Sequence, residues 1–170
     1  LWLDDAYIKH PAFDVLIRKA KLRGAKVVAF QDLPDVLRIG LSTLQLVYPR
    51  RADDNGNHRT TNQRSLVIRG EGDKRSLLLT GDVDAEIESI LATRVEPTEL
   101  LKVPHHGSKT SSSDLILNVL RPCLAIVSSG RGRRGNFPHQ QIVDRYQSHD
   151  VPLFQTRLQG ALTLFAIPTG

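Results

Sequence analysis

Two kinds of hydrophobic pattern alternate along the 170-residue chain, and each predicts a different element of secondary structure. Short apolar runs that end at glycine, proline or charged residues indicate strands. Apolar residues that recur every three or four positions indicate helices with one buried face. The short runs predict strands over residues 1–6, 25–30, 41–48, 64–69, 75–80, 100–103, 123–128, 153–156 and 161–167. The periodic stretches predict helices that begin near Pro11, Asp84, Ser113 and Pro138.

The order of these elements predicts an α/β fold. Residues 1–30 have the pattern of strand, helix and strand, whereas residues 64–80 have that of a hairpin around 70–74. Because hairpins stand beside strand-helix-strand units, we expect a layered sandwich with a mixed sheet and flanking helices, and not a purely parallel, doubly wound sheet. The polar stretches at 49–62 and 129–136 are expected to be surface loops.

Length and composition are those of one globular domain. Hydrophobic residues make up 40% and charged residues 24% of the chain, and the longest apolar runs are too short to cross a membrane. The chain opens at Leu1 and contains no methionine, so we expect it to be a piece of a longer protein. Its single cysteine, Cys123, does not indicate a redox compartment. The net charge of +5 favours a polyanionic partner, although such a balance is also common on surfaces that bind nothing.

Reactive side chains follow directly after two of the predicted buried strands. Asp82 comes after residues 76–81, and His105 and His106 come after residues 100–104. Since α/β sheets carry their sites at the carboxyl ends of strands, we expect these side chains to share one cleft. Asp82 suits the bridging position between two divalent ions, and either histidine suits a metal or the protonation of a leaving oxygen. Taken singly, a Gly-Asp after a strand is most often a turn, and a histidine pair is most often solvated.

Candidate phosphate contacts follow the histidine pair. Ser108 and Lys109 lead through a serine-rich stretch to the N-terminus of a predicted helix, a place that favours anions. A serine-rich helix entry without any ligand would have the same pattern. This stretch therefore predicts a phosphate-binding site, but a helix N-terminus that binds no ligand stays open as the simpler interpretation.

A glycine-rich loop further along carries Arg131, Arg133 and Arg134. Arginines on such a loop would hold a phosphodiester backbone without reading its sequence. A solvated turn is the alternative, because no aromatic residue is interleaved with the arginines. His139, at the start of the following helix, is a further candidate metal ligand or acid.

Five segments carry a resemblance to a known family. They are Asn-Gln-Arg-Ser-Leu-Val-Ile at 62–68, Leu-Leu-Leu-Thr-Gly-Asp at 77–82, Leu-Lys-Val-Pro-His-His-Gly-Ser at 101–108, the stretch from 128–130 to Asn-Phe-Pro-His at 136–139, and Thr156 with Gly160 and Ala161. In this order they resemble the C-terminal metallo-β-lactamase-like domain of ComEC-type DNA internalisation (competence) proteins. The match covers residues 41–170, which resemble the second half of that domain. Residues 1–40 look like the helix-strand unit from its middle.

The resemblance implies an incomplete αββα sandwich with a site for a divalent metal, zinc or manganese. It implies that Asp82 is a bridging ligand, that His105 and His106 serve as ligand or general acid, and that Ser108 with Lys109 meets phosphate. His139 would be the last ligand. The implied activity is hydrolysis of phosphodiesters in the DNA strand that is not imported.

The same resemblance implies the surroundings of this domain. The parent would be a DNA-uptake channel in the bacterial inner membrane, with this domain preferentially on the extracytoplasmic side. Its partners would be DNA, the membrane channel domain and the missing N-terminal half of the same domain. Pairing of two copies as a homodimer is another way to cover the open sheet edge.

Two departures from the family pattern limit what this piece is expected to do. The histidine-rich signature of the type Thr-His-x-Asp-x-Asp-His is absent, and the later histidine-proline dipeptide appears as Phe137-Pro138 followed by His139. We therefore expect this piece to bind metal poorly and to be inactive alone. Two other interpretations stay open: a phosphoesterase or lactonase of the wider metallo-β-lactamase superfamily, and a metal-free DNA-binding or structural domain.

Overall fold

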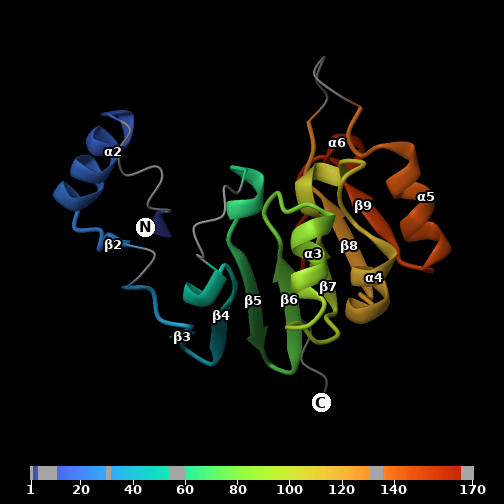
Figure 1. Cartoon of the computed structure of the whole chain (residues 1–170), viewed down its shortest axis with the longest axis horizontal. Coiled ribbons are helices and arrows are strands. Elements are labelled where there is room, and N and C mark those ends of the chain that lie inside the picture. The colour runs from blue at the N-terminus through green and yellow to red at the C-terminus, as the bar shows by residue number, and fades with distance from the viewer. Residues whose placement is uncertain (1, 4–10, 30–31, 54–59, 131–135, 166–170) are drawn as a thin grey trace. The chain divides into compact units, whose positions relative to one another are not determined.

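The computed structural model describes residues 2–3, 11–29, 32–53, 60–130 and 136–165 (Figure 1). The chain forms two compact units, Leu1–Asp35 and Val36–Gly170, and each has its own sheet. The assignment of residues 1–40 to the middle of a domain and of 41–170 to its second half stays a prediction.

The first unit is a small strand-helix-strand motif, as predicted. Strands β1 (Trp2–Leu3) and β2 (Val28–Ala29) pair in parallel, and helix α2 (Pro11–Leu22) connects them in the chain. Proline suits the first helical position, where no backbone N–H is needed. Gly24 ends the helix with φ +76°, and the Ala25 N–H donates to the Ala20 carbonyl, a common way to close a helix C-terminus.

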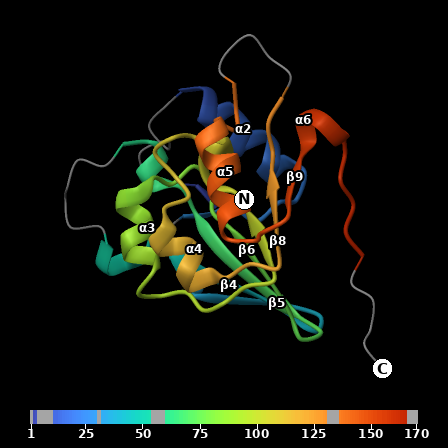
Figure 2. The same ribbon diagram turned by 90° about the vertical axis from the view of Figure 1, so that its right-hand side faces the viewer.

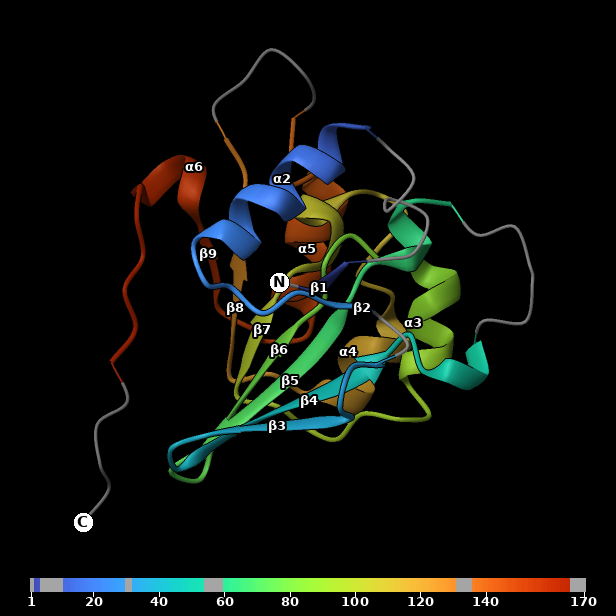
Figure 3. The ribbon, with the colours of Figure 1, turned by 90° about the vertical axis from the view of Figure 1, so that its left-hand side faces the viewer.

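The second unit is built on a seven-stranded mixed sheet, which confirms the predicted α/β class. Its strands lie side by side in chain order (Figure 3). They are β3 (Val36–Ile39), β4 (Ser42–Tyr48), β5 (Val67–Gly72), β6 (Arg75–Leu79), β7 (Leu100–Lys102), β8 (Leu124–Val127) and β9 (Leu153–Gln155). Strands β3 to β6 pair antiparallel, and β6 to β9 pair in parallel.

Helices cover one face of this sheet. Figures 1 and 2 show α3 (Ala85–Leu91), α4 (Asp114–Leu120) and α5 (Gln140–Ser148) on the same side of the strands. As predicted, Asp84 and Ser113 cap α3 and α4, because their side chains accept from the N–H groups of Ile87 and Ile116. Short 3-10 turns lie at Arg51–Asp53, Asn62–Arg64 and Pro104–Gly107, and the four-residue helix α6 (Thr156–Gln159) follows β9.

The two faces of the sheet differ in burial. Leu78, Leu101 and Ala125 are paired across β6, β7 and β8, so they share the helix-covered face, and all three are essentially inaccessible. The neighbouring row lies on the opposite face and consists of half-buried leucines together with a buried glycine. The row contains Leu44, Leu77, Leu100 and Leu124, with Gly70 between Leu44 and Leu77. We call these four leucine side chains the leucine face.

Three elements differ from the sequence-based expectation. A strand was predicted over residues 161–167, but its described part, up to Phe165, is not a strand. Instead α6 follows β9 and ends at Gly160, whose φ of +78° redirects the chain. Strand β3 was not predicted, because its exposed side chains do not alternate between apolar and polar. Among the described residues, no helix is both long enough and apolar enough to cross a lipid bilayer.

Candidate active site at the strand ends

The parallel half of the sheet brings three chain segments to one edge. Strands β6, β7 and β8 all point the same way, so Asp82, the 104–107 turn and Ser128 follow them at their carboxyl ends. Strand β5 runs antiparallel to β6, which places Asn62 and Ser65, before its first residue, at the same edge. The topology therefore gathers polar groups from four chain segments.

The turn that carries Asp82 depends on a glycine. Gly81 has φ +56°, and a Cβ atom there would lie 2.5 Å from Cβ of Ser65. The close approach lets the Asp82 N–H donate to Oγ of Ser65 at 3.0 Å. Ser65 therefore fixes the backbone from which the Asp82 carboxylate projects.

The histidine turn is unusual in its backbone. His105, His106 and Gly107 follow one another with φ values of 48°, 56° and 78°, all in the left-handed region. The His105 N–H donates to the Gly81 carbonyl at 3.2 Å, and the His139 N–H donates to the Gly107 carbonyl at 3.0 Å. Left-handed non-glycine residues cost on the order of 1 kcal/mol each, and such strain tends to gather at functional sites.

His106 is the histidine that faces Asp82. Its Nδ1 lies 2.6 Å from the Ser128 carbonyl oxygen, and because a carbonyl can only accept, Nδ1 carries the hydrogen. Its Nε2 lies 3.7 Å from Oδ2 of Asp82, and both side chains are about two-fifths exposed, at 43% and 38%. An imidazole held by a carbonyl at Nδ1 presents Nε2 for a metal or a proton, which is the arrangement of many ligating histidines.

His105 points to a different partner. Its Nε2 accepts from the Nδ2 amide of Asn62 at 3.2 Å, and its buried Nδ1 has no hydrogen-bond partner in the described part of the chain. The sequence left open which histidine would join Asp82. The structure brings His106 and Asp82 together and pairs His105 with Asn62.

Lys102 links the loop that contains Gly81 to the start of the histidine turn, and no sequence pattern indicated this role. Its Nζ donates to the Gly81 carbonyl at 3.0 Å and to the Val103 carbonyl at 3.2 Å. Partial burial lowers the pKa of Lys102, and the nearby carboxylate of Asp82 opposes that shift. A lysine at a strand end is usually solvated, so only the geometry reveals this cross-link.

The serine-rich stretch is organised around a carboxylate of the protein itself. The N–H groups of Ser112 and Ser113, at the start of α4, both donate to the carboxylate of Glu88, which is only 1% exposed. Burial raises the pKa of Glu88, against the effect of the hydrogen bonds from Ser113 and Ser112 and of the charge of Arg145. These two N–H groups are therefore hydrogen-bonded within the protein, and the anion at the start of α4 is the Glu88 carboxylate.

The remaining candidate residues lie around the same turn or outside the described chain. Ser108 is half-buried, with Oγ 3.2 Å from Oγ1 of Thr110, and Lys109 is exposed. The His139 and His106 rings both contact the Phe137 ring, at centroid distances of 5.1 and 6.4 Å. The predicted arginines of the glycine-rich loop lie outside the described residues: Arg131, Arg133 and Arg134.

The described residues do not by themselves fit a divalent metal. No group of three or more histidine, cysteine, aspartate or glutamate side chains in residues 2–3, 11–29, 32–53, 60–130 and 136–165 is close enough to hold one. Asp82 and His106 make a pair of donors, whereas metal sites in proteins use three or four. Any metal at this edge needs ligands from other residues.

Fold and site together define a mixed α/β unit whose candidate site lies at the carboxyl ends of its parallel strands. No family model matches the chain. A solved structure from Thermotoga maritima, described as a Zn-dependent hydrolase of the metallo-β-lactamase superfamily, aligns with a TM-score of 0.47 and 12% identity, covering 71% of this chain and 60% of the other.

Sequence comparison identifies relatives among competence proteins. The chain is 40% identical over 102 residues to Recombination protein 2 of Haemophilus influenzae, covering 60% of this chain and 13% of that protein. It is 34% identical over 116 residues to Competence protein ComA of Neisseria gonorrhoeae, covering 66% and 16%. It is 29% identical over 167 residues to ComE operon protein 3 of Bacillus subtilis, covering 95% and 20%. The resemblance to ComEC-type proteins is thereby confirmed: the chain is homologous to a segment that makes up a fifth or less of their length.

Proposed function

We propose that this chain is part of a DNA-uptake protein, and that the full-length protein uses the Asp82–His106 edge to hydrolyse phosphodiesters of the strand that is not imported. Homology to competence proteins supports the first part of the proposal. The observation that carries the second part is the 3.7 Å approach of His106 Nε2 to Asp82 at the ends of two parallel strands. The proposed hydrolysis is metal-dependent, with zinc or manganese, and belongs to the longer protein.

The described side chains have defined parts in this proposal. Asp82 supplies a carboxylate on a backbone fixed by Ser65, and His106 supplies a nitrogen whose orientation is fixed by Ser128. Ser108 and Lys109, which follow the turn, are proposed to contact a phosphate oxygen. Because the described donors do not complete a metal site, we propose that other segments of the longer protein supply the remaining ligands and that this piece alone is inactive.

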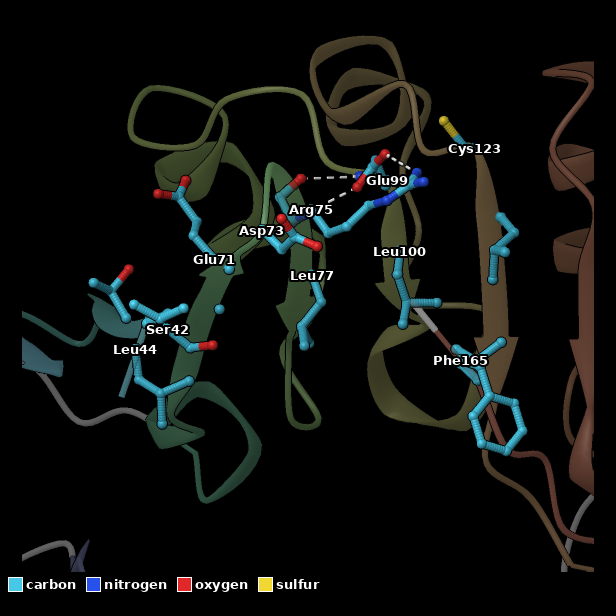
Figure 4. A pocket seen from close by; sticks show the side chains of 17 residues that line it. Ser42, Leu44, Glu71, Asp73, Arg75, Leu77, Glu99, Leu100, Cys123 and Phe165 are labelled. Carbon is cyan, nitrogen blue, oxygen red and sulfur yellow. Dashed lines mark hydrogen bonds and ion pairs between the residues drawn. The ribbon is translucent and has the colours of Figure 1, made fainter. Parts of the chain in front are cut away.

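The leucine face is the proposed contact for the missing half of the domain. An open pocket of about 760 Å³ lies over it, and Figure 4 shows Leu44, Leu77, Leu100 and Phe165 around this pocket. A concave apolar surface of this kind on a sheet is suited to a second layer of structure. We propose that the N-terminal half of the same domain covers it, within a protein of the bacterial inner membrane.

The test is a cleavage assay on a longer protein that includes the upstream half of the domain. Asp82→Ala and His106→Ala should each lower manganese- or zinc-dependent cleavage of DNA by about a hundredfold or more, because each removes a group from the reacting edge. Asp144→Asn, which changes an exposed carboxylate on α5, is the control and should leave cleavage unchanged.

Cleavage that is unchanged in both alanine variants would show that this edge takes no part in the reaction. Binding of DNA without any cleavage by the unaltered longer protein would instead support the metal-free DNA-binding interpretation. Hydrolysis of small phosphodiesters or lactones in preference to DNA would favour a different enzyme of the same superfamily.

A further inference from the structure

The positive charge of the chain is concentrated in one short segment of the first unit. Residues 15–31 contain five of the 23 lysines and arginines and none of the 18 aspartates and glutamates. The rest of the chain therefore carries 18 charges of each sign, and the net charge of +5 equals that of this segment. An even scatter of basic residues would not produce such a division.

The basic side chains of this segment are accessible. Arg18, Lys19 and Lys21 lie on α2, Arg23 and Lys26 follow it, and all five are exposed. No carboxylate in the described part of the chain forms an ion pair with the first four. The dipole of the helix favours cations in its last turn, which accounts for the two lysines but not for the arginines on either side of them.

We propose that α2 and the turn after it form a contact surface for the phosphate backbone of a nucleic acid. Arg18 to Arg23 span about 8 Å along the helix axis at a rise of about 1.5 Å per residue, enough to meet a few consecutive phosphates. No exposed aromatic residue interrupts the cluster, so bases are not stacked there and the contact is independent of sequence. The inference rests on the proposed DNA partner and assigns that partner a second contact, in a different unit from the Asp82–His106 edge.

The distribution of apolar residues favours a nucleic acid over an anionic membrane. A helix that lies on a membrane separates its apolar face from its basic face. Three apolar residues of α2 are exposed: Val15, Leu16 and Leu22. Val15 and Leu22 are each four residues from a basic residue, Lys19 and Arg18, and Leu16 is three residues from Lys19, so each lies beside a basic side chain. Phe13, Ile17 and Ala20 form a separate stripe on this helix, and all three are half-buried.

The experiment compares two variants of equal net charge. In the first, Arg18, Lys19 and Lys21 are changed to Gln, which keeps helix propensity and lowers the net charge by three. In the second, Arg38, Lys74 and Arg121, exposed residues of the other unit, are changed to Gln. Affinity for a labelled oligothymidine strand of about 20 nucleotides is measured by fluorescence anisotropy across a range of salt concentrations, with circular dichroism as the check of folding.

We expect the α2 variant to bind about tenfold or more weakly and its salt slope to fall by about 2, since each lost phosphate contact removes about 0.7 from the slope for a single strand. The affinity of the matched variant for the oligonucleotide should stay within about threefold of that of the unaltered chain. Equal losses in both variants, or none in either, would overturn the proposal. The proposal would also be overturned if the α2 variant lost binding to phosphatidylglycerol vesicles but still bound the oligonucleotide as the unaltered chain does. No cleavage is measured here, so failure of the proposed hydrolysis would leave this result unaffected.

Discussion

At the scale of single residues, the 105–107 turn gives the two neighbouring histidines different partners. Its left-handed backbone sends His106 to Asp82 and His105 to Asn62. The turn is held from both sides, by the Gly81 carbonyl before it and by the residues around Pro138 after it. Orientation of the candidate catalytic group therefore depends on contacts that lie far apart in the sequence.

Gly107 is the residue of this turn that tolerates a side chain least. A Cβ atom there would lie 2.4 Å from Cβ of Pro138, and its φ of +78° is unfavourable for any residue other than glycine. We expect Gly107→Ala to lower the free energy of unfolding by about 2 to 4 kcal/mol, measured by urea denaturation. The control is Gly130→Ala, where a Cβ meets nothing within 4 Å, and equal losses for the two changes would contradict this account of the turn.

The sequence predicted which residues gather at the site better than how they are oriented. Asp82 and the histidine pair were expected at one edge, because apolar strands end directly before them. The choice of His106 over His105 was not predictable, since it depends on positive φ values that histidine rarely adopts. The hairpin of β5 with β6 was predicted, but the contacts of Asn62 with His105 and of Ser65 with Asp82 were not, because they join residues 43 and 17 positions apart.

At the scale of elements, a buried carboxylate joins three helices. Glu88 of α3 accepts from the N–H groups that begin α4, and Arg145 of α5 donates to the Ser112 carbonyl at 2.7 Å. The Ser111 hydroxyl then donates to the Pro104 carbonyl at 3.0 Å, which connects this network to the histidine turn. The helices thus support the site through a polar network as well as through the apolar core.

The raised pKa of Glu88 predicts a pH dependence of stability. Because the folded protein holds this proton more tightly than the unfolded chain, the contribution of Glu88 is greatest below its unfolded pKa of about 4.5 and falls as pH rises through the folded pKa. The difference in free energy of unfolding between the unaltered protein and Glu88→Gln should therefore be larger at pH 4.5 than at pH 7. Urea denaturation at both values measures it.

The exposed Glu86 on the same helix provides the control for this experiment. Glu86→Gln should change stability by less than about 0.5 kcal/mol at either pH. A Glu88→Gln difference that is constant with pH, or that grows as pH rises, would show that the carboxylate is not held in the way the structure indicates.

Elements with strong periodicity were predicted, and those that depend on neighbours were not. Helices α3 and α4 begin at their predicted caps because a polar side chain followed by a periodic apolar stripe is a local signal. Strand β3 is exposed along its length and is held by its hairpin with β4, so its sequence does not alternate between buried apolar and exposed polar residues. Residues 161–165 have an apolar composition but lie outside the sheet, which shows that composition alone does not determine pairing.

At the scale of the whole molecule, the main sheet of the second unit is covered by helices on one side and carries the leucine face on the other. The consecutive residues Leu101 and Leu100 belong to these two faces, and the first is 1% exposed whereas the second is half-buried. This pair permits a test of whether a further layer covers the leucine face in the longer protein.

We expect Leu101→Ala to lower the free energy of unfolding by about 3 kcal/mol in this chain, because it opens a cavity in a closed core. Leu100→Ala should cost about 1 kcal/mol in this chain but about as much as Leu101→Ala in the longer protein. Denaturant titration of both proteins gives the comparison. An unchanged cost for Leu100→Ala in the longer protein would mean that no further layer of structure packs there.

The Gly81 carbonyl accepts from both the His105 backbone and the Lys102 side chain, so one oxygen atom links the acidic loop to the imidazole turn. We therefore expect the two loops to move together, so that a ligand that displaces Asp82 would displace the histidine turn as well.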